Sequence, residues 1–509
     1  MESVVPLLVV VPLGAAFAIV AMAHVRGLRR VTGSLAVAAV LANLVMAVWL
    51  IGVDVRVFVG GWGPEPFQTL GIELVCDGLA RLMLVTINLV AAVSIVFAGA
   101  YMRRFTGGWL FEALFLLMTG AMNGVVLAGD LFNLFVFLEV AAIASYALVG
   151  FGCEAEELEA AFKYLVLGTV GSAFILVGVT ILYSLTGQLN MAKVAELLPA
   201  VGATGPAVLL AAAALMGGLA LKAAMVPFHA WLPDAHPSAP APISAMLSGV
   251  LIKASGVYAL ARVVFNVLGP APQYATILIA LGAISMVVGV FLAVGQWDFK
   301  RLLAYHSISQ MGYVVLALGV GADVLARGDV RIAGLCLFGG LFHLFNHAAF
   351  KSLLFLSSGA IEQQTGTRQL KEMGGLSRRM PLTSFCCRVG ALSIAGVPPF
   401  NGFFSKLIII IALALAGRLW LAGLAVFVAL MTLLSFIKVQ RYALEGDSGP
   451  RAATAREAPA MMGVASLALA VVCLVAGLAM IPLREHLFGP AGSALMGRAL
   501  QAVAMGVAP

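Results

Sequence analysis

The chain has 509 residues, of which 62% are hydrophobic and only 10% charged, and its formal net charge is +7. Soluble domains carry about 25% charged residues, so this composition excludes an ordinary water-soluble fold and indicates a membrane protein. A positive balance can also mean nucleic-acid binding, but the basic residues lie in short segments between apolar runs, which is the distribution expected of cytoplasmic loops.

Apolar stretches long enough to cross a bilayer follow one another along the chain, since a helix needs about 20 apolar residues to span a ~30 Å hydrocarbon core. In chain order, the fourteen predicted spans are 3–23, 31–53, 76–100, 109–128, 131–151, 160–184, 206–226, 240–265, 273–295, 302–321, 331–360, 382–417, 418–437 and 460–481. The stretch 331–360 is long for one crossing and 382–417 is much too long, so both need a break or a tilt. The sequence predicts a single all-α membrane domain over 1–509.

The loop charges favour an even number of crossings. When alternate loops are assigned to the cytoplasm, starting with the first, that side collects most of the Lys and Arg residues, including Arg103, Arg104, Arg378 and Arg379. This bias predicts a multi-pass protein of the cell inner (cytoplasmic) membrane with both termini outside.

Two spans contain helix breakers at mid-membrane depth. Pro227 follows Lys222 by five residues, and the pair Pro398-Pro399 precedes Lys406. Proline removes a backbone donor and clashes with the preceding turn, and in lipid the freed carbonyls must find partners inside protein or beside water. A broken helix near a buried charge in each half of the chain is typical of transporters built from inverted repeats, although a packing kink beside a snorkelling lysine is the alternative.

The candidate buried ionisable residues of the predicted spans are Glu139, Lys222, Lys253 and Lys406. A charge near the bilayer centre costs at least about 2.5–3.5 kcal/mol, so it normally faces a partner or a water-filled cavity. Burial disfavours the charged form of both residue types and pairing favours it. A lysine that alternates between a glutamate partner and isolation would therefore take up and release a proton.

His343 and His347 stand four residues apart, on one helix face and near Lys351. This spacing can bind a metal ion, but no further ligand lies nearby in the sequence, so a proton relay or an inter-helix hydrogen bond is the favoured interpretation. The six cysteines form no C-x-x-C pair and no G-x-G-x-x-G loop is present, so we expect no cofactor, iron–sulfur cluster or metal in this chain.

Further polar residues lie in or beside these spans. His306 could extend a polar path or serve as a plain hydrogen-bonding group. His229 and His236 lie at a helix end beside the first break, on either side of Asp234, where gating and interfacial anchoring are both open.

Three segments resemble the antiporter-like subunits of respiratory complex I, the large subunits of Mrp-type cation/proton antiporters and the membrane arms of energy-converting hydrogenases. They are Pro227-Phe-His-Ala-Trp-Leu-Pro-Asp-Ala-His236, Asp298-Phe-Lys-Arg-Leu-Leu-Ala-Tyr-His-Ser-Ile-Ser309 and His347-Ala-Ala-Phe-Lys-Ser-Leu-Leu-Phe-Leu356. The resemblance covers roughly spans 3 to 13. It implies fourteen helices, with N-terminal helices at 1–105, inverted five-helix repeats at 109–265 and 273–437, and a final helix at 460–481.

The resemblance also implies a hydrophilic axis in the membrane plane. Glu139 matches a glutamate that pairs with a lysine at the position of Lys222, and Lys253 matches a central lysine. Lys406 matches the residue that hands protons to the exit side. His343, His347 and Lys163 match further polar positions.

The local sequence around Lys163 and Asp234 most resembles energy-converting hydrogenase arms and the D-type component of Mrp antiporters, with a complex I subunit as the alternative. About 28 residues follow the last span, so no long lateral helix is expected there.

The leading hypothesis is an ion-translocating subunit, not catalytic by itself, within a larger membrane complex. It would move H⁺, with exchange for Na⁺ left open, beside other hydrophobic subunits and, in a redox-driven complex, iron–sulfur partners. A free-standing secondary transporter and a non-transporting scaffold are the competing hypotheses. Four buried ionisable residues argue against the scaffold.

Overall fold

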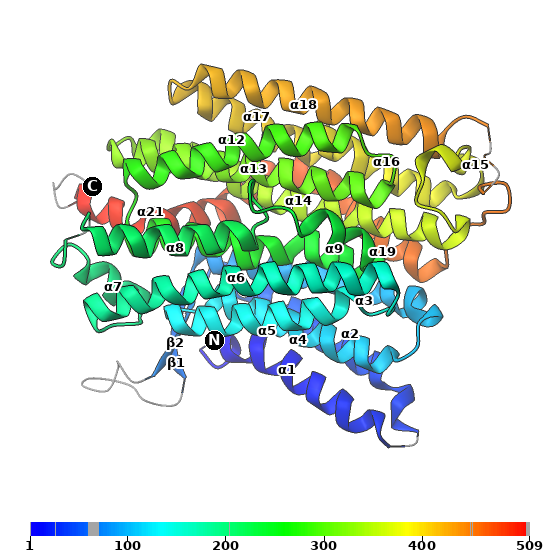
Figure 1. Cartoon of the computed structure of the whole chain (residues 1–509), viewed down its shortest axis with the longest axis horizontal. Helices are drawn as coiled ribbons and strands as arrows, with labels where there is room; N and C mark the ends of the chain where they lie inside the picture. The colour runs from blue at the N-terminus through cyan, green and yellow to red at the C-terminus, as the bar shows by residue number, and fades with distance from the viewer. Residues whose placement is uncertain are drawn as a thin grey trace.

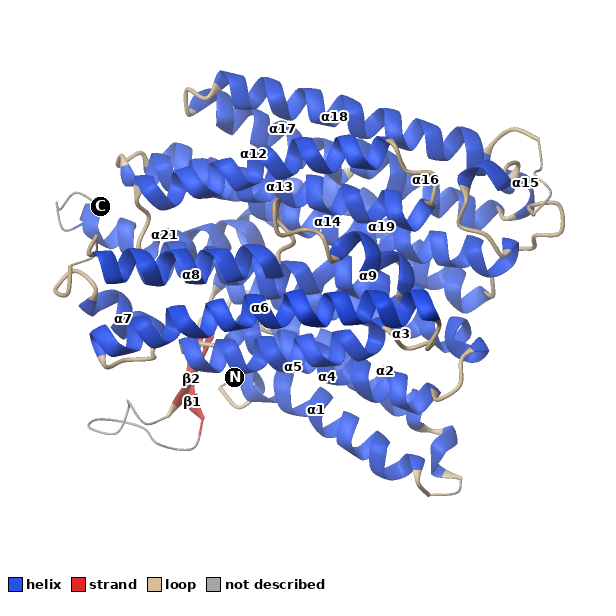
Figure 2. Ribbon diagram, in the orientation of Figure 1, coloured by secondary structure: helices blue, strands red, loops and turns tan. Residues whose placement is uncertain are grey.

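Long helices make up nearly all of the computed structural model, which describes residues 2–25, 27–59, 71–202, 204–447, 449 and 451–504. The helices lie side by side with their axes roughly parallel (Figure 1), and the only strands in the described chain form one short hairpin (Figure 2). A helix satisfies its own backbone hydrogen bonds, which is why apolar runs of this length adopt it in lipid.

The first half contains α1 (Val4–Ala23), α2 (Thr32–Trp49), α3 (Gly78–Tyr101), α4 (Gly108–Leu127), α5 (Leu131–Val149), α6 (Ala155–Thr186), α7 (Met191–Leu197), α8 (Pro206–Lys222), α9 (Leu232–Ser238) and α10 (Ala241–Met246). The helix begun by α10 continues to Leu268 through π-helical turns at Leu247–Leu251, Lys253–Tyr258 and Arg262–Leu268, interrupted by α11 (Ala259–Ala261).

The second half contains α12 (Pro272–Val294), α13 (Phe299–Ala326), α14 (Val330–Thr365), α15 (Leu376–Arg379), α16 (Pro381–Ala395), α17 (Asn401–Leu415), α18 (Leu419–Val439) and α19 (Ala460–Leu478). It ends with α20 (Met480–Leu483) and α21 (Gly489–Ala504).

Twelve helices of the described chain are long and apolar enough to cross a membrane, so the expectation of an all-α, multi-pass membrane protein is confirmed. The other two predicted crossings correspond to shorter apolar helices, α8 alone and the pair α16 and α17. The count of fourteen crossings and the inverted repeats therefore stay predictions.

The centre of the bundle is formed by α13, α14 and the helix at 241–268, whose side chains are almost all buried. Outer helices present apolar side chains sideways: Phe162 and Phe174 of α6 and Trp420 of α18 are each more than half exposed. These surfaces suit contact with lipid or with another membrane protein. The polar residues of interest thus lie on the most enclosed helices.

The expectation that 331–360 and 382–417 need a break or a tilt has two outcomes. α14 is a single unbroken helix of 36 residues, which at ~1.5 Å per residue is about 54 Å long and outreaches a hydrocarbon core. The second stretch does break, between Ala395 and Asn401.

Besides the short helices α7, α9, α15 and α20, a strand hairpin and a last helix lie wholly or partly outside the predicted spans. Residues Val55–Val59 (β1) and Ile72–Cys76 (β2) pair as an antiparallel hairpin, and α21 packs against α3 and α14 beyond the last predicted span.

The two ends of the bundle differ. Figure 1 places the hairpin, the start of α1 and α21 towards one end of the bundle, and α15, with Arg378 and Arg379, at the other. We call the end with α15 the basic end.

Candidate functional site

The first helix break joins a lysine to a carboxylate. α8 ends at Lys222, because Ala224 has a positive φ of 53° and Pro227 cannot continue the helix. The Lys222 Nζ lies 3.2 Å from the Glu139 Oε1 of α5, and the Ser172 hydroxyl of α6 donates to the same oxygen. The Lys222 side chain is 5% exposed and that of Glu139 29%, so the ammonium is enclosed while the carboxylate reaches the side of the bundle.

The second break also presents a lysine to freed backbone. α16 ends at Ala395, and the next residue, Gly396, has a φ of 82°. The buried Lys406 of α17 donates from its Nζ to the Ile394 carbonyl at 2.7 Å. That carbonyl belongs to the last turn of α16, where intrahelical donors run out. Each break therefore holds an ammonium, the first on a carboxylate and the second on a main-chain oxygen.

The polar positions of α14 face the second break. The His343 Nδ1 lies 2.9 Å from the Ser405 hydroxyl. The Asn346 amide donates to the Asn401 carbonyl at 3.0 Å, and the Asn401 amide donates back to Asn346 at 3.1 Å. These bonds hold α14 beside α17, so that His343 and Lys406 belong to one polar cluster.

Between the two breaks lies a third group of buried ionisable residues. Lys253 is fully buried and its Nζ donates to the Ser248 carbonyl at 2.6 Å, within the π-helical segment. His347 and Lys351 of α14 are also fully buried, and neither the His347 ring nitrogens nor the Lys351 Nζ has a hydrogen-bond partner in the described chain. Polar groups buried in this way are normally satisfied by protein or by internal water.

Close packing of the helices places these groups one after another in space. Gly256, three residues after Lys253, packs against the Ala223 backbone beside Lys222, and the Ser352 hydroxyl beside Lys351 donates to the Ala245 carbonyl at 3.1 Å. The residues therefore form a row that runs from the Glu139–Lys222 pair through Lys253, then Lys351 and His347, to His343 and Lys406. We call this row the polar axis.

Gly256 offers a test of the packing at the first break. A Cβ at this position would lie about 2.4 Å from the Ala223 Cα, so we expect Gly256→Val to force the break open and lower the free energy of unfolding by at least about 1–3 kcal/mol. Thermal unfolding of the detergent-solubilised protein measures this. Gly217→Val is the matched control, because a Cβ on Gly217 of α8 meets no atom within 4 Å. Equal melting temperatures for the two variants would contradict the close contact.

The remaining predicted residues occupy different surroundings. His306 of α13 is fully buried and neither ring nitrogen has a partner in the described chain, whereas His229 lies half-buried at the first break.

Lys163 lies outside the polar axis. Its side chain is 46% exposed and its Nζ pairs with Glu159 at 2.7 Å and Asp234 at 3.0 Å. Asp234 also pairs with Arg301 at 3.2 Å, so these residues form a surface ion-pair cluster.

Two enclosed ion pairs were not predicted from the sequence. The Lys300 Nζ lies 2.8 Å from Glu362 Oε2, with side chains 3% and 21% exposed. At the opposite end of the bundle, Arg262 makes two bonds to Asp77, the residue that caps α3. Burial would raise the pKa of Asp77, but the Arg262 guanidinium outweighs it and holds this pKa below its usual range.

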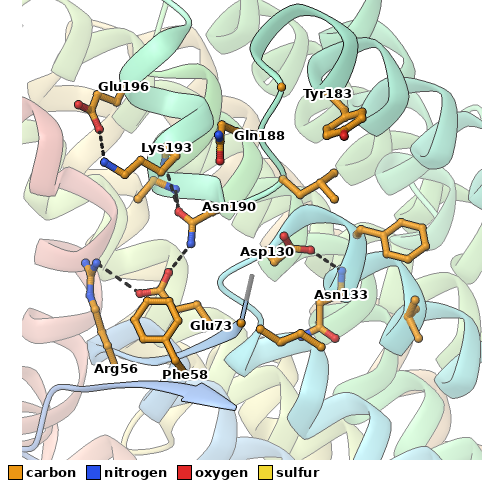
Figure 3. A pocket seen from close by; sticks show the side chains of 17 residues that line it. Arg56, Phe58, Glu73, Asp130, Asn133, Tyr183, Gln188, Asn190, Lys193 and Glu196 are labelled. Atoms are coloured by element: carbon orange, nitrogen blue, oxygen red, sulfur yellow. Dashed lines mark hydrogen bonds and ion pairs between the residues drawn. The ribbon is translucent and has the colours of Figure 1, made fainter. Parts of the chain in front are cut away.

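A pocket of about 960 Å³ lies near the hairpin. Figure 3 shows Glu73 of β2 between Arg56 and Asn190, with Lys193 paired to Glu196. No residue of the polar axis lines it. Among the described residues, no group of three or more His, Cys, Asp or Glu side chains could hold a metal ion.

Residues 128–432 match the family described as NADH:quinone oxidoreductase/Mrp antiporter, TM. The chain is 38% identical over 442 residues to NADH-quinone oxidoreductase subunit N of Desulforudis audaxviator, covering 83% of this chain and 84% of that protein. It is 35% identical over 479 residues to the D-type component of the Na(+)/H(+) antiporter of Alkalihalophilus pseudofirmus, covering 94% and 93%.

A solved structure extends this likeness to the fold. A chain of the Mrp complex from Dietzia sp. DQ12-45-1b superposes with a TM-score of 0.87 at 29% identity, over 97% of this chain and 98% of that one. The resemblance inferred from the motifs is thereby confirmed.

Proposed function

This chain belongs to the NADH:quinone oxidoreductase/Mrp antiporter family, and we propose that it moves protons along the polar axis as one subunit of a larger membrane complex. The observation that carries the proposal is the contrast between its lysines. Lys222 is paired with Glu139, whereas Lys253 and Lys406 are equally buried and donate only to main-chain carbonyls.

This contrast suits stepwise proton transfer. An ammonium near the bilayer centre costs at least about 2.5–3.5 kcal/mol, and a nearby carboxylate offsets that cost. When Lys222 moves away from Glu139, its proton is favourably passed on towards Lys253. His347 and His343 can each accept a proton on one ring nitrogen and release one from the other, which connects Lys253 and Lys351 to Lys406.

The charge states of neighbouring groups couple the steps. A proton that reaches Lys253 repels one on Lys351, and opening of the Glu139–Lys222 pair removes the negative charge that held the first proton. Glu139 is 29% exposed at the side of the bundle, so a charge on an adjacent subunit could bias this pair. Energy from a partner would thus be delivered as a change in local charge.

Exchange of H⁺ for Na⁺ is the second candidate, favoured by the likeness to the D-type component of the Na(+)/H(+) antiporter. The proposed partners are other hydrophobic subunits. The likeness to NADH-quinone oxidoreductase subunit N adds redox subunits with iron–sulfur clusters as one energy source.

The proposed location is the inner (cytoplasmic) membrane, with both termini outside and the basic end facing the cytoplasm, where Lys and Arg are enriched.

Purification from the native membrane in mild detergent, followed by reconstitution of the whole complex in liposomes with a pH-sensitive dye, tests the proposal. We expect membrane subunits to co-purify and the internal pH to change when the complex is energised, either by an electron donor and a quinone or by a Na⁺ gradient. Pumping that starts with the donor would identify a redox-driven complex, and pumping that starts with Na⁺ an antiporter. A chain that purified alone and carried an organic solute would overturn the proposal.

A further inference from the structure

A buried ion pair outside the polar axis lies beneath an open pocket. Lys300, in the first turn of α13, reaches Glu362, in the last turn of α14, and the Lys300 side chain is only 3% exposed. The Lys300 Nζ also lies 3.4 Å from the Ala239 carbonyl. Beyond Glu362, α14 leads to α15, so the pair lies towards the basic end.

The pocket above this pair opens to the surroundings of the bundle. It encloses about 510 Å³ and is lined by Glu362, Lys300, Arg104, Arg368 and Glu156, among others. The Glu156 side chain is 80% exposed, so water reaches the pocket from the basic end. The lining therefore changes from solvated charges at the mouth to an enclosed ion pair at the floor.

On its inner side the pocket approaches the polar axis. Residues 237–240 line it, and the residue before them, His236, is fully buried with no partner for either ring nitrogen in the described chain. His236 and Lys351 both lie against the Phe355 ring, whose centroid is 5.9 Å from the His236 ring centroid and 5.7 Å from the Lys351 Nζ. A buried imidazole with two free nitrogens thus stands between the pocket floor and the central lysines.

We propose that Lys300 and Glu362 form the loading site at which a proton enters the polar axis from the basic end, with His236 as the next acceptor. This inference rests on the proposed function. A proton from water in the pocket adds to a Glu362 oxygen, which weakens the bond to Lys300. It then passes to one ring nitrogen of His236, directly or through water, while the other ring nitrogen releases a proton towards Lys253, and Glu362 returns to its charged form.

A purely structural clamp between α13 and α14 would not need this arrangement. Two apolar side chains of similar volume would hold the helices at equal or lower cost, because desolvation of a buried ion pair largely cancels its attraction. A clamp would also need no solvent access, whereas the Glu362 carboxylate lines a pocket that water enters.

Substitution of Glu362 tests the inference in the intact complex. Glu362→Gln keeps the shape of the side chain but removes its negative charge, and we expect it to slow proton movement by at least about tenfold. Glu362→Asp should restore part of the rate. The matched control is Glu445→Gln, since Glu445 pairs with Arg388 at 3.3 Å but is 61% exposed. A Glu362→Gln complex that assembles and pumps like Glu445→Gln would overturn the loading site.

A labelling experiment gives a readout that a structural role would not produce. Ser238 lines the pocket and is half-buried, so Ser238→Cys in a Cys153→Ser background, which removes the one exposed cysteine of the described chain, places a thiol at the entrance. A membrane-impermeant maleimide should block transport when added from the basic side only. Arg379→Cys, exposed at the same end, should be labelled without loss of transport.

The outcomes separate this inference from the proposed function. If labelled Ser238→Cys and Glu362→Gln both pump normally while Lys222→Ala does not, the polar axis is supported as the proton path and the loading site is excluded. If Lys222→Ala also pumps normally, the polar axis itself falls.

Discussion

Replacing Lys222 by Ala is expected to reduce proton movement by the intact complex by about two orders of magnitude while leaving assembly unchanged. The Lys222 Nζ lies 3.2 Å from Glu139 and is the only ammonium of the polar axis, within the described chain, that meets a carboxylate. A positioned acid–base group typically contributes about 10²–10⁴-fold to a proton-transfer rate. The measurement is the initial rate of internal pH change in liposomes that contain the whole complex.

A double-mutant cycle with Glu139→Gln distinguishes a working pair from two independent residues. If the pair acts as one switch, the double variant should be about as slow as Lys222→Ala alone, because the second change removes an interaction already lost. Lys163→Ala is the control, since Lys163 pairs with two carboxylates at the surface and is 46% exposed. Normal transport by Lys222→Ala would exclude the polar axis as the proton path.

The helices and both breaks could be predicted because each rests on a local property of the chain. Apolar runs of about 20 residues predict a transmembrane helix, and the prolines at 227 and 398–399 predict that α8 and α16 end shortly before them. The π-helical turns between Leu247 and Leu268 and the β1–β2 hairpin could not be predicted in this way. Both depend on which neighbouring helices pack around them, and no residue spacing encodes that.

The same limit separates the polar residues that were predicted from those that were missed. Lys222 and Lys406 could be recognised because a charge within an apolar run is costly wherever its partner lies. Lys300 was not recognised, because it follows Asp298 and precedes Arg301 at the start of a span, and charges at such positions usually belong to loops. Its partner Glu362 is 62 residues away along the chain, and only the packing of α13 against α14 brings the two together.

Ser172 illustrates a third case. A serine in a membrane helix most often donates to the carbonyl one turn earlier, and Ser172 does so to Gly168 at 3.0 Å. Its second bond, to Glu139, depends on the contact between α5 and α6. Glu139 could therefore be recognised as a candidate charged group from the sequence, whereas its partner Ser172 could be identified only from the packing of α5 against α6.

Lys253→Met is expected to have effects of opposite sign on stability and on transport. Lys253 is fully buried and its only hydrogen bond in the described chain is to the Ser248 carbonyl at 2.6 Å. Loss of one such bond costs about 1 kcal/mol, whereas removal of a charge from mid-membrane depth gains about 2.5–3.5 kcal/mol. The balance predicts a more stable protein that no longer moves protons. Thermal unfolding of the solubilised complex and the liposome assay measure the two effects.

Lys438→Met should behave in the opposite way and is the matched control. The Lys438 Nζ donates to the Val294 carbonyl at 2.7 Å and the Gln296 carbonyl at 2.6 Å, where α12 ends and backbone donors run out. Its loss should lower the melting temperature and leave transport intact. If Lys253→Met were less stable than the parent chain and still pumped, Lys253 would be a structural residue. A stable, inactive variant would mean that the chain retains a costly central charge because proton movement requires it, as expected where activity and stability conflict.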